Sequence, residues 1–143
     1  MQFVETPGQL VILYEWDHYF LVIPIDGRQQ VKDPDPLQSL GYSVGKWEGD
    51  TLDIDVVGLS DYTWIDANAG VHGDALHIVE RYTMLDPDTI GYEATLDDAK
   101  AWTTPWHVRA TLKRRPANDK LMEYNCAENN KPEDHAQGGN PPQ

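Results

Sequence analysis

Apolar residues in this chain occur in short runs separated by turn residues, and within several runs apolar and polar positions alternate. Alternation with a period of two is typical of β-strands with one buried face, and no long helical period is present. The pattern predicts strands over 10–16 and 19–25, a hairpin over 43–56, and further strands over 76–85, 90–96, 106–114 and 121–126. One short helical turn is expected near 97–102.

The hairpin over 43–56 has a specific predicted register. Gly49-Asp50 is a two-residue turn of the kind that joins antiparallel strands. A turn at this position sets Lys46 opposite Asp53 and Trp47 beside Leu52. A second turn at 86–89 predicts a further set of facing pairs: Met84–Ile90, Tyr82–Tyr92, Arg81–Glu93, Glu80–Ala94 and His77–Asp97.

About eight to ten short strands linked mostly by hairpins favour an all-β fold, either an antiparallel β-barrel or a rolled sheet of the lipocalin or calycin type. Closure into a barrel would also remove the exposed edges of an aromatic-rich sheet. We expect a single domain over 1–126. Residues 127–143 contain no Leu, Ile, Val or Phe and are expected to form a polar, loosely ordered tail.

Composition narrows the function classes. The 143 residues carry 24 Asp plus Glu against 11 Lys plus Arg, a net charge of −13 at pH 7. An acidic surface repels phosphate groups, so nucleic acid and anionic lipid are not expected partners. No run approaches the roughly 20 apolar residues of a membrane span. The lone Cys126 excludes an internal disulfide and a cysteine-based zinc site.

The start of the chain shows no secretory signal, because neither a basic region nor an apolar stretch follows Met1. A cytoplasmic location is therefore expected for the sequence as given. A periplasmic or secreted location stays open if the natural N-terminus is longer.

Three segments carry a resemblance. Residues 45–52 (GKWEGDTL), 63–66 (TWID) and 72–82 (HGDALHIVERY) are similar to those of a family of uncharacterised bacterial all-β proteins, many of which resemble secreted ones. The likeness covers about residues 2–130. It implies no particular activity. Asp53 stands where that family is more often apolar, and Leu21 where it is more often basic.

Glu80 is the first candidate for chemistry. Alternation places it on one face of its strand with Leu76, Ile78, Tyr82 and Met84, where it is the only charged residue. A carboxyl group among apolar side chains is desolvated, which raises its pKa towards the range of a general acid or base. The alternative is a structural acid that an arginine or a tyrosine hydroxyl satisfies.

Histidines supply the next candidates. His77 is predicted opposite Asp97, and a carboxylate beside an imidazole fixes its tautomer and raises its basicity. His72 lies nearby in the chain and is a further candidate. The alternative for His77 and Asp97 is a cross-strand pair on the solvent side. Hydrolysis of a glycoside would instead pair Glu80 with Asp97 or Asp66.

No metal or cofactor is expected. His77 and Glu80 point to opposite faces of one strand, so the two side chains cannot bind the same ion without a bulge. The spacing of His72, Asp66 and Asp74 matches no metal signature.

The loop over 58–74 contains the candidate binding residues. Trp64 is positioned to stack on a sugar or aromatic ring, with Asp66 and His72 orienting it, or else to act as an apolar plug. Further aromatic groups for the pocket are Tyr14, Tyr82 and Trp106.

Two functions follow from these candidates. The preferred one is an enzyme using cofactor-independent acid/base chemistry, as a lyase, isomerase, cyclase or hydrolase, on a polar or aromatic substrate held in a barrel pocket. The alternative is a lipocalin-like protein that binds a small molecule without catalysis. A homodimer is compatible with both.

Overall fold

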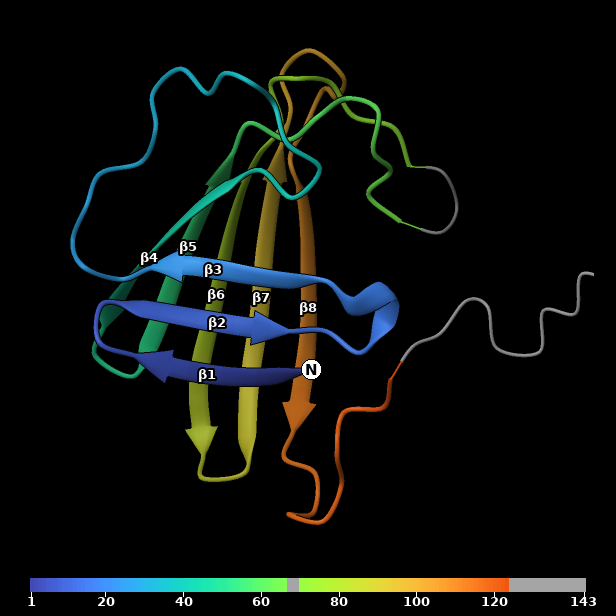
Figure 1. The fold of residues 1–143 in the computed structure, drawn as a ribbon. Coiled ribbons are helices and arrows are strands. Elements are labelled where there is room, and N and C mark those ends of the chain that lie inside the picture. The colour runs from blue at the N-terminus through green and yellow to red at the C-terminus, as the bar shows by residue number, and fades with distance from the viewer. Residues whose placement is uncertain (67–69, 124–143) are drawn as a thin grey trace, which may run out of the picture.

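The computed structural model describes residues 1–66 and 70–123, whose strands form two antiparallel sheets (Figure 1). The three-stranded sheet has the order β1-β2-β3 and the five-stranded sheet the order β4-β5-β6-β7-β8. The elements are β1 (Gln2–Thr6), β2 (Gln9–Leu13), η1 (Trp16–His18), β3 (Phe20–Pro24), β4 (Tyr42–Glu48), β5 (Thr51–Val57), β6 (His77–Asp86), β7 (Thr89–Asp97) and β8 (Trp106–Lys113). The predicted all-β, antiparallel class is confirmed.

Both predicted hairpin registers are confirmed. Lys46 pairs with Asp53 and Trp47 with Leu52 across β4 and β5. Every facing pair predicted between β6 and β7 is also present, from Met84–Ile90 at the turn to His77–Asp97 at the far end. These registers were predictable because a short turn leaves one way to align alternating strands.

Two strand predictions were wrong. β1 was not expected, because Gln2–Thr6 contains a single apolar side chain on its inward face, Phe3, and so shows no clear alternation. A strand over 121–126 was expected, yet residues 121–123 form none, and 124–126 lie outside the described residues. The predicted tail over 127–143 and the predicted domain end at 126 also lie outside them.

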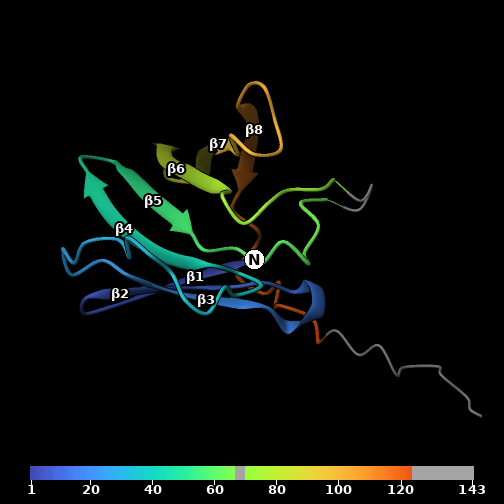
Figure 2. The same cartoon turned by 90° about the horizontal axis from the view of Figure 1, so that it is seen from above.

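The two sheets pack across one another (Figures 1 and 2). In the part of the chain that the structure describes, no strand ladder joins them. Figure 2 shows the five-stranded sheet curving away from β1–β3 towards β8. Gly45 permits the close approach of β4, because a Cβ there would lie 2.9 Å from Cγ2 of Ile25 and 3.1 Å from Cγ2 of Ile23.

The core lies between the sheets and is built from inward positions of the four strands β2, β3, β5 and β6. Its buried members are Leu10, Ile12, Ile23, Leu52, Ile54, Val56 and Tyr82. A smaller cluster of Leu76, Ala94 and Leu96 lies against Trp102 and Ile65. This burial stabilises the packing of one sheet on the other, since each apolar side chain removed from water contributes on the order of 1.5–3 kcal/mol.

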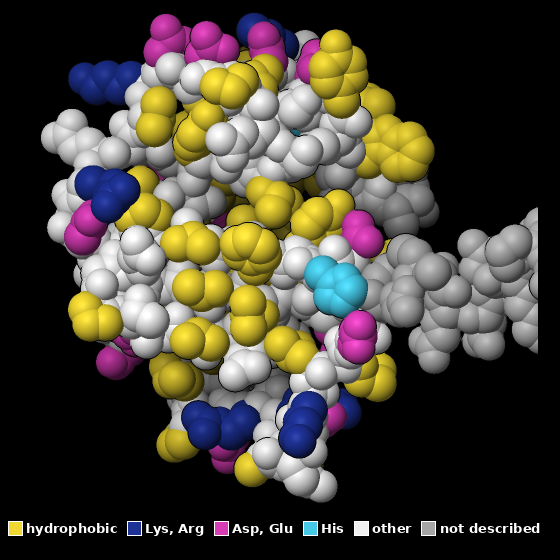
Figure 3. Space-filling view, viewed as in Figure 1, with side chains coloured by type: hydrophobic (Ala, Val, Ile, Leu, Met, Phe, Trp, Pro, Cys, Tyr) yellow, Lys and Arg dark blue, Asp and Glu magenta, His cyan; other side chains and the backbone are white. Residues whose placement is uncertain are grey.

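The outward faces of the two sheets differ in charge. The outward positions of β1–β3 carry no charged side chain, as the front view in Figure 3 illustrates, and they are Gln2, Val4, Thr6, Gln9, Val11, Leu13, Phe20, Val22 and Pro24. The outward face of the other sheet carries a row of alternating charges in register, Lys46–Asp53–Arg81–Glu93–Arg109. Arg81 Nε lies 2.9 Å from Asp53 Oδ1 in this row.

We expect Arg81→Ala to lower the free energy of unfolding by about 0.2–1 kcal/mol, because an exposed ion pair in water contributes little. Urea unfolding at low salt measures the loss, which should shrink in 1 M NaCl as screening weakens the row. Lys32→Ala, which removes a charge of the same sign from an exposed loop, is the control. A loss above about 2 kcal/mol would contradict this estimate.

Candidate functional site

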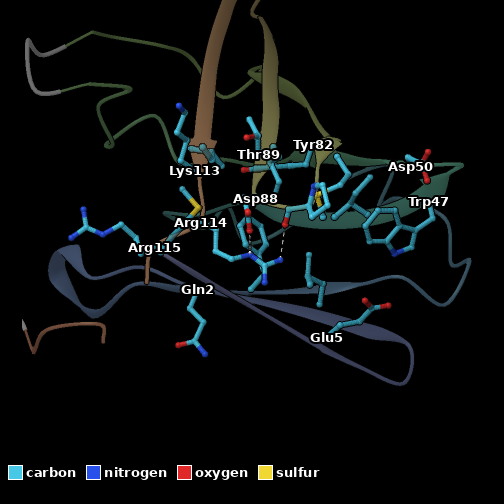
Figure 4. A pocket seen from close by; sticks show the side chains of 18 of the residues that line it. Gln2, Glu5, Trp47, Asp50, Tyr82, Asp88, Thr89, Lys113, Arg114 and Arg115 are labelled. Carbon is cyan, nitrogen blue, oxygen red and sulfur yellow. Dashed lines mark hydrogen bonds and ion pairs between the residues drawn. The ribbon is translucent and has the colours of Figure 1, made fainter. Parts of the chain in front are cut away.

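A cavity of about 860 Å³ opens between the two sheets beside the β4–β5 and β6–β7 turns (Figure 4). Its volume lies within the range of about 300–1,000 Å³ that small-molecule sites occupy. Its apolar walls come from both sheets and consist of Phe3, Leu10, Leu52, Tyr82, Met84, Ile90 and Leu112. These walls bring together residues of β1 and β2 from one sheet and of β5–β8 from the other.

The mouth of this cavity carries charged side chains. Figure 4 shows Glu5, Asp50 and Trp47 on one side and Lys113 and Arg115, whose side chains point away from the cavity, on the other. Between them, Arg114 Nε lies 3.2 Å from Asp88 Oδ1, and the same guanidinium donates to the Pro87 carbonyl at 2.9 Å. This ion pair ties β8 to the β6–β7 turn.

Glu80 is half-buried on the inward face of β6, and its cross-strand neighbours are Ile54 and Ala94. The Tyr92 hydroxyl donates to Glu80 Oε1 at 2.7 Å, and the Tyr82 hydroxyl donates to the same oxygen at 3.3 Å. The Tyr82 and Tyr92 rings pack together with their centroids 4.9 Å apart. The predicted charged group on an apolar face is therefore present, and tyrosine hydroxyls satisfy it.

Burial is the main cause of the pKa shifts in this cluster. It raises the pKa of Glu80, although the hydrogen bonds from Tyr92 and Tyr82 partly oppose the shift. Burial also raises the pKa of Tyr82, Tyr92 and Tyr14, and the nearby Glu80 charge adds to each rise. The tyrosines therefore remain protonated hydrogen-bond donors across the physiological pH range.

Tyr82 connects the cluster to the cavity. Its ring lines the cavity wall, packs edge-on against Phe3 with centroids 5.6 Å apart, and carries its hydroxyl towards Glu80. Glu80 itself does not line the cavity. Tyr82 is thus the residue that both lines the cavity and contacts the carboxyl group of Glu80.

His77 and Asp97 are in register, as predicted, but their predicted side-chain pair is wrong. His77 Nε2 lies 3.0 Å from Asp55 Oδ2 on β5, while Asp97 is exposed. Gln30 Nε2 donates to Asp55 Oδ1 at 2.9 Å and holds that carboxylate in place. Because this pair lies on the outward face, it cannot act together with Glu80.

His72 is buried within the loop and takes part in local hydrogen bonds. Its Nδ1 donates to the Gly73 carbonyl at 2.8 Å, and its Nε2 lies 2.9 Å from the Thr63 hydroxyl. Both ring nitrogens therefore have partners inside the loop, and His72 does not line the cavity. Its contacts shape the segment between β5 and β6.

The predicted binding residues are dispersed. Trp64 is 68 % exposed and outside the cavity, and Asp66 accepts a hydrogen bond from the Gly70 N–H at 3.0 Å. Trp106 stacks on Trp102 with centroids 4.6 Å apart. Tyr14 belongs to the Glu80 cluster, so Tyr82 alone among the predicted site residues lines the cavity.

Asp98 is a buried polar residue that was not predicted. It is 1 % exposed, and its carboxylate accepts N–H groups of Gly73 at 2.5 Å, Lys100 at 3.0 Å and Ala101 at 3.2 Å. These bonds join the loop before β6 to the turn after β7. An Asp that begins a turn was the available signal, because its side chain often accepts N–H groups two or three residues later.

The cavity residues on β1 and at the end of β8 were missed as well. Phe3 and Glu5 lie on an unpredicted strand, and Lys113 and Arg115 are charges at a strand end. No local pattern marks such residues, since they meet only when the sheets pack. For Trp47 the sequence does contain a signal, because the predicted hairpin sets it beside the apolar Leu52.

Within residues 1–66 and 70–123, no three His, Cys, Asp or Glu side chains gather closely enough to hold a metal ion. No helix in that same part of the chain has the length and apolar character needed to cross a membrane.

Comparisons with protein-family models, with curated proteins and with solved structures found no match to this chain.

Proposed function

We propose that this protein binds one small apolar or amphipathic molecule between its sheets, in the manner of a lipocalin. The observation that carries the proposal is the cavity of about 860 Å³ with apolar walls and a charged mouth. Buried apolar walls bind a ligand by removing its surface from water, and a few polar groups orient it. A curved sheet crossed by a second sheet encloses such a space as a rolled sheet does.

Binding is favoured over catalysis because the titratable groups do not converge. His77 pairs with Asp55 on the outward face, and His72 is held within its loop. Glu80 accepts two tyrosine hydroxyls, which is the arrangement of a satisfied structural acid.

The test is titration with the neutral apolar dye Nile red, followed by fluorescence. We expect saturable binding of one dye per chain. Met84→Trp should weaken it about tenfold or more, since Met84 lines the cavity and a larger ring would fill the space. Met84 is about half exposed, so the substitution need not disturb the core.

Leu85→Trp is the matched control. Leu85 is the next residue, is more exposed than Met84 and does not line the cavity. The proposal fails if the dye does not bind, or if the two tryptophan variants weaken binding equally.

An acid/base enzyme is the second candidate, and one contact favours it. The Tyr82 hydroxyl lies 3.3 Å from a carboxyl group of raised pKa while its ring faces the cavity. A proton of the ligand could pass through this phenol to Glu80. Any ligand that displaces Nile red should then be converted by the wild type and not by Glu80→Gln. Recovery of every such ligand unchanged would exclude this candidate.

A further inference from the structure

Two side chains at one end of the cavity face inward and remain accessible. Glu5 of β1 lies opposite Leu10, and Trp47 of β4 lies opposite Leu52, so each shares the inward face of its sheet with a buried leucine. Both line the cavity, on the side where Figure 4 also shows Asp50. Glu5 is nonetheless exposed, and Trp47 is 48 % exposed. One side chain from each sheet thus presents its surface to whatever occupies the cavity.

The carboxylates on this side have no basic partner. Within residues 1–66 and 70–123, neither Glu5 nor Asp50 forms an ion pair. Asp50 belongs to the β4–β5 turn and adds a second negative charge beside Trp47. The potential at this end of the cavity is therefore negative, and a cation that a ligand brings there gains favourable Coulomb energy.

The basic side chains around the cavity do not supply a site for an anion. Arg114 faces inward, but its guanidinium is already paired with the Asp88 carboxylate. Lys113 occupies an outward position at the end of β8 and, like Arg115, points away from the cavity in Figure 4. Arg115 is also paired with Asp119. These three residues therefore leave no free positive charge facing a ligand.

A cationic end group suits both Trp47 and Glu5. An indole ring attracts a cation through the negative face of its π-system, and a carboxylate attracts it by charge. Both attractions are stronger beside apolar walls than in open water, because the local dielectric constant is lower. A ligand that ends in a carboxylate would instead be repelled by Glu5 and Asp50. The sign of the charge on the end group therefore determines which ligands bind well.

We infer that the cavity selects an amphiphile with an apolar body and a single cationic end, such as an alkylamine, and discriminates against one with an anionic end. The cationic end contacts Glu5 and Trp47, and the apolar body lies along Phe3, Leu10 and Leu52. This inference rests on the proposed function, and it adds the chemical class of the ligand.

The test uses three compounds that share a ten-carbon chain and differ only in the end group. They are 1-decylamine, 1-decanol and decanoic acid, titrated at pH 7 and low salt by displacement of Nile red and by calorimetry. The amine should bind about three- to tenfold more tightly than the alcohol, as expected for a cation on one indole ring and one partly exposed carboxylate. The acid should bind less tightly than the alcohol, and salt should reduce both differences.

Two variants test the contacts through the ratio of amine affinity to alcohol affinity. Glu5→Gln removes the charge and keeps the shape, so it should lower this ratio about threefold or more. Trp47→Leu keeps an apolar side chain without a π-system, and it should lower the ratio as well. Asp61→Asn is the matched control, because it removes one negative charge at an exposed position outside the cavity. It measures the general attraction of an acidic protein for cations.

The outcomes separate the two proposals. Equal affinity for the amine and the alcohol, tightest binding of the acid, a ratio unchanged in Trp47→Leu, or equal effects of Glu5→Gln and Asp61→Asn on the ratio would overturn the inference. If Nile red still binds in a Met84-dependent way, the proposed function stands after such a result. If neither the dye nor any of the three compounds binds, both proposals fail.

Discussion

Ile23→Ala is expected to lower the free energy of unfolding by about 2–5 kcal/mol, because it removes buried methyl groups and leaves a cavity that the neighbours fill only in part. Ile23 is 0 % exposed and packs from β3 against Gly45 of the other sheet. The lost free energy comes from the contact between the two sheets, because each sheet needs the other to cover its apolar face. Urea unfolding followed by tryptophan fluorescence measures it.

Val22→Ala is the matched control. Val22 precedes Ile23 on the same strand, points the opposite way and is 47 % exposed. Its truncation should cost well under half as much, since little additional surface is exposed on unfolding. Similar losses for the two variants would show that β3 does not bury one face against the second sheet.

The stabilising contribution of Glu80 is expected to be greatest at acidic pH and to fall as the pH rises. Burial raises the folded-state pKa of Glu80 above its ordinary value of 4.5, so the folded chain holds this proton more tightly than the unfolded chain does. The contribution is complete below the unfolded pKa and is lost as the pH passes through the folded pKa. Each unit of difference corresponds to about 1.4 kcal/mol.

Glu80→Gln removes this titration and retains an oxygen that accepts from Tyr92. The difference in unfolding free energy between wild type and Glu80→Gln, measured from pH 4 to pH 8, should therefore shift steadily in favour of the variant. Taking the difference matters because carboxylates such as Asp26, whose pKa is lowered to about 2 mainly by Arg28, act in the opposite direction. Glu93→Gln on the exposed face is the control, and a flat difference for Glu80→Gln would show that its carboxyl group is not desolvated.

Local pattern was enough to predict the hairpins. The β4–β5 and β6–β7 registers depend on turns of two to four residues and on strict alternation, so neighbouring residues contain the information. The same reasoning identified Glu80 as a charge on an apolar face. β1 was not predicted, because Phe3 is its one apolar residue that packs against the core and a single residue shows no alternation.

The sequence could not identify the partners of the site residues. Facing positions in adjacent strands suggested Asp97 for His77, yet the imidazole reaches a residue of β5 on its other side. An inner strand of a sheet has one adjacent strand on each side. A side chain can contact either of these strands, and the sequence does not show which way it turns. Tyr14 illustrates the same limit, since the end of β2 places it near the charge of Glu80, which lies far away in the chain.

From the sequence alone follow the strands, the two hairpin registers, the acidic exterior and the unusual place of Glu80, because each depends on alternation or composition within a short stretch of chain. Tyr82 and Tyr92 reach Glu80 within the β6–β7 hairpin. The cavity, by contrast, arises from residues of both sheets, such as Phe3 and Leu10 of one and Leu52 and Ile90 of the other. These meet only when one sheet crosses the other, and the packing of buried side chains such as Ile23 and Ile54 determines that crossing.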